Sequence, residues 1–252
     1  MKIKDTLSSL TVPDYITISN GLLGFLAITY IIDKKFYLAS IILIICIGLD
    51  GLDGYLARKL SLVHELGSYL DMVSDTLSFC FAPAMLVYSS YYDISLGRAW
   101  QSPINALSTL VPMMIVFFGV LRLSRFVDIQ KEDKIYTGLP TPLFTLFIAC
   151  ITYFFGWGEV YDISFYIPLL VIFLISLFLY SNILYPKLMG PIRKIIGSIF
   201  LVIALMGFIF TKSNLQIGNI FIWITLFVCI LYIIIGPILV DKYDHEKRRN
   251  CK

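Results

Sequence analysis

Eight long hydrophobic runs dominate this chain of 252 residues. Hydrophobic residues make up 58% of the sequence and charged residues only 15%, a balance that is not typical of a soluble domain. A helix needs about 20 mostly apolar residues to cross a bilayer, and each run approaches that length. We therefore predict an all-α, polytopic membrane helix bundle with about eight transmembrane helices, at residues 16–32, 36–57, 67–90, 104–122, 140–156, 163–184, 192–211 and 217–238.

The segment before the first run is short and amphipathic. Ile3, Leu7 and Leu10 fall on one helical face, which predicts a short N-terminal interfacial helix before Pro13. The chain shows no internal repeat and no low-complexity linker, and its loops are short. A single integral membrane domain over residues 1–252 is therefore predicted.

Basic residues are distributed unequally between the two sides of these eight runs. Only Lys34, Lys35, Arg98 and Lys212 fall on one side, and the other sixteen of the 20 Lys and Arg residues fall on the opposite side. Loops rich in Lys and Arg stay in the cytoplasm, so both termini are predicted to face it. The net charge of +3 follows from this topology, and nucleic acid is not a predicted partner.

Four aspartates occur between Asp50 and Asp75, in the frame D-x2-D-G-x2-A-R-x8-G-x3-D-x3-D. Asp50 and Asp53 lie one helical turn apart, as do Asp71 and Asp75 on the next run. The loop RKLSLVHE between the runs is short, so we expect antiparallel neighbours whose acidic faces meet. An unpaired carboxylate near the middle of a bilayer costs roughly 2.5 to 3.5 kcal/mol. Four of them indicate a buried site that binds a hard divalent metal through oxygen ligands.

Acidic residues inside a membrane can also move protons or pass cations. Paired aspartates occur in proton relays and cation channels, and a cation transporter is a remote alternative here. In a transporter the Arg58 and Gly67 positions of the frame would have no shared purpose. The chain has two histidines, His64 and His245, and neither has a partner at metal-ligand spacing, although His64 lies in the loop beside the aspartates.

The frame, with eight residues between Arg58 and Gly67, resembles the signature of the CDP-alcohol phosphotransferase family, integral membrane enzymes that make phospholipid head groups. The segment GVLRLSRFVDIQKEDKIYTGLPTP is similar to the R-L-A-R-F-N and F-x-G-x-P segments of the phosphatidylserine synthase branch. The opening VPDYITISNGLLGFLAI is similar to the first span of that branch. The resemblance covers residues 12–142 and departs from the branch at Ser124, Val127 and Asp128, where Ala and then Asn are common.

The resemblance implies a reaction. A phosphatidyl or archaetidyl group would pass from CDP-diacylglycerol or CDP-archaeol to L-serine, with release of CMP. It implies that Asp50, Asp53 and Asp71 ligate Mg2+ or Mn2+, with two ions in the site. Asp75 would take the proton of the acceptor hydroxyl and share in the second metal. The resemblance also implies a homodimer, a core of residues 12–185 and an additional pair of spans at 190–240.

Small and basic residues of the frame are candidates for binding the CDP-lipid. Gly54 and Ala57 allow a cytidine ring or phosphate to approach the helix, although small residues also serve helix packing in membranes. Arg58 can bind a phosphate oxygen, and Gly67 opens the facing helix tightly. The predicted CDP-lipid-binding residues are Thr17, Asn20, Gly54, Ala57, Arg58 and Gly67.

Arg122 and Arg125 are the candidates for binding the acceptor. They are three residues apart at the cytoplasmic end of the fourth run, where we expect them to face the same way. A guanidinium can hold the serine carboxylate with two hydrogen bonds, although arginines at this place also anchor a helix at the membrane surface.

The acceptor and the lipid tails stay open at this point. The same CDP-lipid chemistry with glycerol 3-phosphate or inositol phosphate as acceptor is the alternative to serine. The sequence does not distinguish diacylglycerol esters from archaeal ether lipids, nor Mg2+ from Mn2+.

Overall fold

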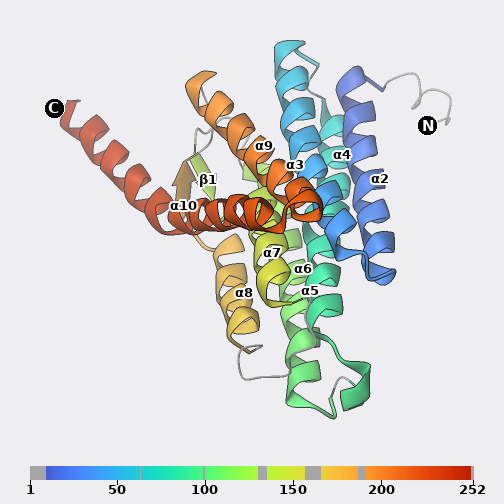
Figure 1. The fold of residues 1–252 in the computed structure, drawn as a ribbon. Coiled ribbons are helices and arrows are strands. Elements are labelled where there is room, and N and C mark those ends of the chain that lie inside the picture. The colour runs from blue at the N-terminus through green and yellow to red at the C-terminus, as the bar shows by residue number, and fades with distance from the viewer. Residues whose placement is uncertain are drawn as a thin grey trace.

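The computed structural model describes residues 10–62, 64–98, 100–129, 135–156, 166–186 and 191–250. For residues 126–129, 135–136, 191–194 and 241–250 the structure describes the backbone only. The described chain is almost entirely helical, which confirms the predicted all-α bundle (Figure 1). The predicted interfacial helix before Pro13 lies mostly outside the described residues. The long and intermediate helices are α2 (Val12–Ile32), α3 (Phe36–Lys59), α4 (Glu65–Asp75), α5 (Ala82–Tyr91), α6 (Pro103–Ile129), α7 (Thr141–Phe155), α8 (Tyr166–Leu179), α9 (Pro191–Ser213) and α10 (Leu215–Asn250).

Six stretches of these helices are long and apolar enough to cross a membrane. One of them joins α4, the π-helix η1 (Thr76–Phe81) and α5 into a continuous span. The helices α7 and α8 are apolar but shorter. Together they account for the eight predicted runs, so the chain is a multi-pass membrane protein. The 3-10 turn η2 (Ile94–Leu96) lies between α5 and α6.

The sixth predicted run, 163–184, extends too far along the chain. Helix α8 ends at Leu179, and β2 (Leu184–Pro186) pairs antiparallel with β1 (Ile135–Thr137), so the bundle includes one two-stranded ribbon. The backbone N–H of Gly138 donates to the carbonyl of Ile183, which extends the contact toward α7. Hydrophobicity could not reveal this, because a short apolar strand and the end of an apolar helix have similar composition.

Helix α7 forms the centre of the bundle. Every residue from Phe144 to Thr152 is buried, and the helix packs against α3, α5, α8 and α10. Its N-terminus follows Gly138, whose φ of 80° is a left-handed conformation that suits glycine. A short helix can therefore sit at the core, because its neighbours shield it on all sides.

Helix α2 packs closely against both α3 and the α4–η1 segment. Glycines permit the second contact: a side chain at Gly21 would meet Ser74, and one at Gly24 would meet the backbone of Ser78. Small residues at such interfaces let helices approach closely inside membranes. The hydroxyl of Ser78 donates to the backbone carbonyl of Asn20 (3.0 Å), which ties the π-helix to α2.

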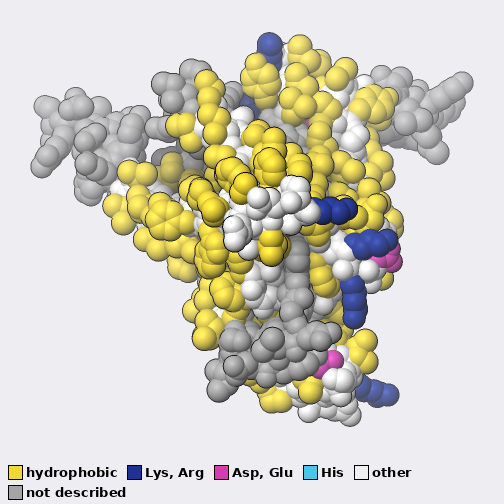
Figure 2. All heavy atoms as spheres, in the orientation of Figure 1, with side chains coloured by type: hydrophobic (Ala, Val, Ile, Leu, Met, Phe, Trp, Pro, Cys, Tyr) yellow, Lys and Arg dark blue, Asp and Glu magenta, His cyan; other side chains and the backbone are white. Residues whose placement is uncertain are grey.

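The last two helices wrap around the outside. In Figure 1 the first part of α10 runs across the bundle and not along it, and it packs against α9, α7 and β2. The face shown in Figure 2 is covered mainly by hydrophobic side chains. Many large apolar residues of α9 and α10 are exposed, including Ile199, Ile220 and Phe227. Such a surface suits contact with lipid.

The close contact of α2 with η1 leads to a stability prediction. Alanine at Gly24 would place a Cβ 2.8 Å from the Cα of Ser78. Because backbone atoms cannot move aside cheaply, Gly24→Ala should cost about 1–3 kcal/mol. The measurement is the thermal unfolding midpoint of the purified protein in detergent, which should fall by several degrees. Gly51→Ala is the matched control, since its added Cβ would meet no atom of another helix within 4 Å. An equal midpoint for both variants would contradict this account.

Candidate active site

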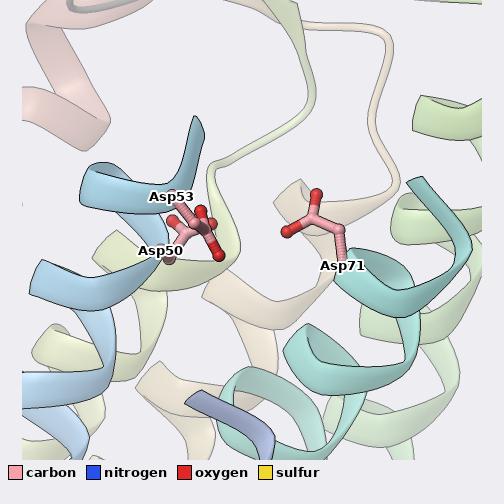
Figure 3. Close-up of side chains that lie close together, drawn as sticks. All are labelled: Asp50, Asp53 and Asp71. Atoms are coloured by element: carbon pink, nitrogen blue, oxygen red, sulfur yellow. The ribbon is translucent and has the colours of Figure 1, made fainter. Parts of the chain in front are cut away.

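Three of the four aspartates form a cluster between two helices. Asp50 and Asp53 lie one turn apart on α3, and Asp71 comes from α4 (Figure 3). Each offers a carboxylate oxygen, and these oxygens all lie within 4.8 Å of one another. Asp53 is buried, whereas Asp50 and Asp71 are partly buried. The spacing in the sequence therefore brings these side chains together as predicted.

The acidic faces of α3 and α4 meet as the short loop suggested, but the two helices pack more closely on a third helix than on each other. Helix α2 packs against both α3 and α4, and these two are in only slight contact with each other. The helical spacing identified the acidic faces correctly, but it could not identify α2 as a third helix that packs against both of them. The cluster therefore lies over α2, which becomes part of the site.

Polar side chains of α2 reach two of the aspartates. The hydroxyl of Thr17 donates to Oδ2 of Asp53 (2.6 Å). The amide Nδ2 of Asn20 lies 3.5 Å from Oδ1 of Asp75, a long contact between two buried groups. Thr17 and Asn20 thus lie beside the acidic residues, and their binding of CDP-lipid stays a prediction.

Asp75 lies one turn beyond Asp71 and outside the cluster of three. Its side chain is buried, at the point where α4 passes into the π-helix η1. π-Helical turns within α-helices are rare and frequent at functional sites. The segment from Ser74 to Ser78 is fixed against α2 by the glycine contacts and by Asn20. Asp75 is therefore held on a backbone with little freedom.

Acidic groups outnumber basic ones around the cluster. In the described part of the chain, two arginines, Arg58 and Arg122, lie within electrostatic range of the four aspartates. Carboxylates gathered in an apolar bundle repel one another and lose hydration, so their ionised form needs a compensating charge, which two arginines supply only in part. Three oxygen donors at this separation suit a hard divalent cation. The donor set therefore fits a metal of the Mg2+ or Mn2+ type.

Arg58 lies at the edge of this site. Its two terminal nitrogens would be 3.4 Å from a Cβ at Gly54, so the guanidinium folds back along its own helix. Gly54, Ala57 and Arg58 occupy the same segment of α3, where Gly54 and Ala57 are partly buried. A guanidinium is thus present at the edge of the acidic cluster, and binding of a phosphate by Arg58 stays a prediction.

Gly67 has a structural reason to be glycine. A Cβ there would come within 2.8 Å of Oδ1 of Asp14 and 3.3 Å of Cε1 of His64. Asp14 is buried near the start of α2, and His64 caps α4 by accepting a hydrogen bond from the backbone N–H of Gly67. The tight start of the facing helix, expected from the sequence, thus results from contact with these two residues.

Sequence reasoning missed Asp14 and gave His64 no partner. A signal for Asp14 was present, because Asp14, Thr17 and Asn20 recur at three-residue spacing on one face of α2. The partner of His64 lies 50 residues away in the sequence, so no local pattern could reveal it.

Arg122 and Arg125 do not face the same environment, contrary to the expectation. Helix α6 continues to Ile129, so both lie within it and not at its end. Arg122 is buried, donates to the hydroxyl of Thr141 (2.9 Å), and lies within electrostatic range of Asp50 and Asp75. Arg125 stacks over the ring of Tyr180, with 3.6 Å between its guanidinium carbon and the ring centroid. Of the two arginines, Arg122 is the one near the acidic residues.

Comparison with known proteins adds a separate line of support. Residues 10–179 match the family model of CDP-alcohol phosphatidyltransferase. An archaetidylserine synthase of Methanothermobacter thermautotrophicus is 33% identical over 195 residues, which cover 75% of this chain and 76% of that protein. A CDP-diacylglycerol–serine O-phosphatidyltransferase of Methanocaldococcus jannaschii is 31% identical over 198 residues, covering 79% and 85%. One of the same name from Helicobacter pylori is 29% identical over 182 residues, covering 69% and 71%.

The family match begins just before α2 and ends at the last residue of α8. It therefore includes all four aspartates and both arginines, and it leaves α9 and α10 outside. This confirms the family that the acidic frame indicated. The chain belongs to the CDP-alcohol phosphatidyltransferase family.

Proposed function

We propose that this membrane enzyme transfers a phosphatidyl or archaetidyl group from a CDP-activated lipid to L-serine and releases CMP. The observation that carries the proposal is the cluster of Asp50, Asp53 and Asp71, in a chain of this family. Relatives that share most of their length with this chain carry the names of serine transferases, which supports serine as the acceptor.

Asp50, Asp53 and Asp71 are the proposed metal ligands. A bound divalent ion would supply positive charge that offsets the charge of the pyrophosphate oxygens during transfer. Mg2+ and Mn2+ both suit carboxylate ligands, and a second ion would include Asp75 among its ligands. Thr17 orients Asp53 by donating to one of its oxygens, which leaves the other oxygen for the ion.

Asp75 is the proposed base. It accepts the proton of the serine hydroxyl while the serine oxygen forms a bond to the phosphorus that carries the lipid. The bond from that phosphorus to the bridging oxygen breaks, and the electron pair leaves with CMP. Asn20 holds the Asp75 carboxylate in place by donating to Oδ1. Burial of Asp75 keeps bulk water from competing with the serine hydroxyl.

Basic residues complete the site. Arg58, beside Gly54, is placed to bind a phosphate oxygen of the CDP moiety, and Ala57 leaves room beside it. Arg122 is the proposed partner of the serine carboxylate, whereas Arg125 is engaged with Tyr180. A cytoplasmic location of the site and of both termini is supported by the distribution of Lys and Arg. A homodimer stays a prediction from the family resemblance.

An acceptor panel tests the proposed function. Membranes or purified enzyme receive Mn2+ or Mg2+, CDP-diacylglycerol or CDP-archaeol, and labelled serine, glycerol 3-phosphate or inositol phosphate. We expect labelled serine lipid and an equal amount of CMP, measured by mass spectrometry. If product forms only with another acceptor, that acceptor replaces serine in the proposal, and transfer from the CDP-lipid stands. No CMP with any acceptor, together with cation flux in proteoliposomes that is independent of CDP-lipid, would favour the transporter alternative.

The metal ligands lead to a prediction that does not depend on turnover. A ligand that binds only the folded state at about 100 times its Kd stabilises it by about 2.7 kcal/mol. Saturating Mn2+ should therefore raise the thermal unfolding midpoint of the wild-type protein. This shift should largely disappear in Asp50→Asn, Asp53→Asn and Asp71→Asn, each of which should also lack turnover. Asp33→Asn is the matched control, because this exposed aspartate lies at the other end of α2.

Asp75→Asn should behave differently from those variants. It should lose turnover and yet retain more of the CDP-lipid affinity measured in the presence of Mn2+, because the three clustered carboxylates remain. For the Asp50, Asp53 and Asp71 variants, a rise in the unfolding midpoint with Mn2+ equal to that of the wild-type protein would refute the metal assignment.

Arg122 leads to a prediction about the acceptor. Lysine cannot reproduce the two parallel hydrogen bonds of a guanidinium to a carboxylate. Arg122→Lys should raise the KM for serine at least about tenfold, a loss of about 1.4 kcal/mol in binding. The KM for CDP-lipid should change little. Arg125→Lys is the control and should have a much smaller effect, because Arg125 stacks on Tyr180. If the KM for serine is unchanged in Arg122→Lys, Arg122 does not bind the acceptor and its role is structural.

A further inference from the structure

The starts of α2 and α4 are joined through Asp14 and His64. Asp14 is the third residue of α2, and its Oδ2 accepts hydrogen bonds from the backbone N–H (2.6 Å) and the hydroxyl (2.7 Å) of Thr11. The same oxygen lies 3.0 Å from Nε2 of His64. On its other side the imidazole receives the N–H of Gly67 at Nδ1 (3.1 Å). One side chain thus connects the capped ends of two helices.

The second contact fixes the position of the ring proton. A backbone N–H can only donate, so Nδ1 of His64 is the acceptor and the ring proton is on Nε2. The Nε2–H then donates to the carboxylate of Asp14. Both ring nitrogens are used, and the imidazole has one orientation that satisfies both contacts. His64 therefore acts as a link of fixed length between Asp14 and the first turn of α4.

This link between α2 and α4 matters because α3 and α4 have little direct contact with each other. Each packs on α2, and each is attached to it near the acidic cluster by a short polar contact. Thr17 attaches α3 through Asp53, and Asp14 attaches α4 through His64. Asp71 lies four residues after Gly67, about 6 Å along a rigid helix. A displacement of the start of α4 would therefore displace Asp71 relative to Asp50 and Asp53.

We propose that His64 is a positioning residue that sets the separation of Asp71 from Asp50 and Asp53 by holding α4 on Asp14. It acts through the helix that carries one of the proposed metal ligands. The inference rests on the proposed metal role of these aspartates. It assigns a function to His64, which is not one of the fixed positions of the aspartate frame.

The test separates the two contacts of His64. His64→Asn keeps a side-chain oxygen that caps Gly67 but is too short to reach Asp14, whereas His64→Ala loses both contacts. The readout is the Kd for Mn2+, measured by electron paramagnetic resonance on the purified protein without CDP-lipid. We expect both variants to bind Mn2+ at least about fivefold more weakly than wild type. Glu65→Gln, an exposed neighbour in the first turn of α4, is the matched control and should bind normally.

A second variant addresses the same link without changing the histidine. Gly67→Ala would push a Cβ toward Oδ1 of Asp14 and should weaken Mn2+ binding to a similar degree. It decides the matter if the His64 variants do not elute as folded protein in size-exclusion chromatography. If His64→Asn folds and binds Mn2+ as tightly as the wild-type protein, the inference is overturned. If the His64 variants do not fold, wild-type Mn2+ affinity in Gly67→Ala overturns it.

Asp71→Asn, measured in parallel, separates this inference from the proposed function. If Asp71→Asn loses Mn2+ and His64→Asn does not, the metal site stands and only the positioning role of His64 fails. If Asp71→Asn binds Mn2+ like wild type, the metal assignment itself fails.

Discussion

The burial of several carboxylates between apolar helices is the constraint on which this structure depends. Carboxylates lose hydration inside a membrane bundle, and Asp50, Asp53 and Asp71 repel one another at their short separation. The nearby arginines lie to the side: Arg58 folds along Gly54, and Arg122 donates to Thr141. Two guanidinium groups offset the charge of four aspartates only in part. The protein thus keeps an acidic site at a cost in stability that the proposed divalent cation would offset.

Helix α2 makes that arrangement geometrically possible. Along one face it alternates polar groups, which contact the acidic helices, with glycines, which allow those helices to come close. Thr17 and Asn20 reach Asp53 and Asp75, while Gly21 and Gly24 receive Ser74 and Ser78. Close packing makes the short hydrogen bonds possible, and the hydrogen bonds set the register of the packing. A larger residue at either glycine would therefore change the site as well as the fold.

The acidic site was largely predictable because helical spacing assigns residues to faces. The spacing grouped Asp50 with Asp53 and placed Asp71 opposite them, as the structure does. It could not show that α2 lies against both helices, because a periodic pattern defines a face but not its neighbour. The link between Asp14 and His64 was missed for the same reason. The two arginines were expected to act together because they are three residues apart, but the spacing could not show that Arg122 meets Thr141 while Arg125 meets Tyr180.

The helices beyond the family match are tied to the part of the bundle that carries Arg122. The hydroxyl of Tyr232 on α10 donates to the carbonyl of Pro186 on β2 (2.8 Å), and the rings of Tyr232 and Tyr185 stack. Strand β2 pairs with β1, which leads through Gly138 into the N-terminus of α7, where Thr141 accepts from Arg122. Helix α10 thus packs on the short ribbon and donates a hydrogen bond to one of its backbone carbonyls. Because that ribbon precedes Thr141 closely, the additional helices stabilise the backbone next to the proposed acceptor residue while lying outside the site itself.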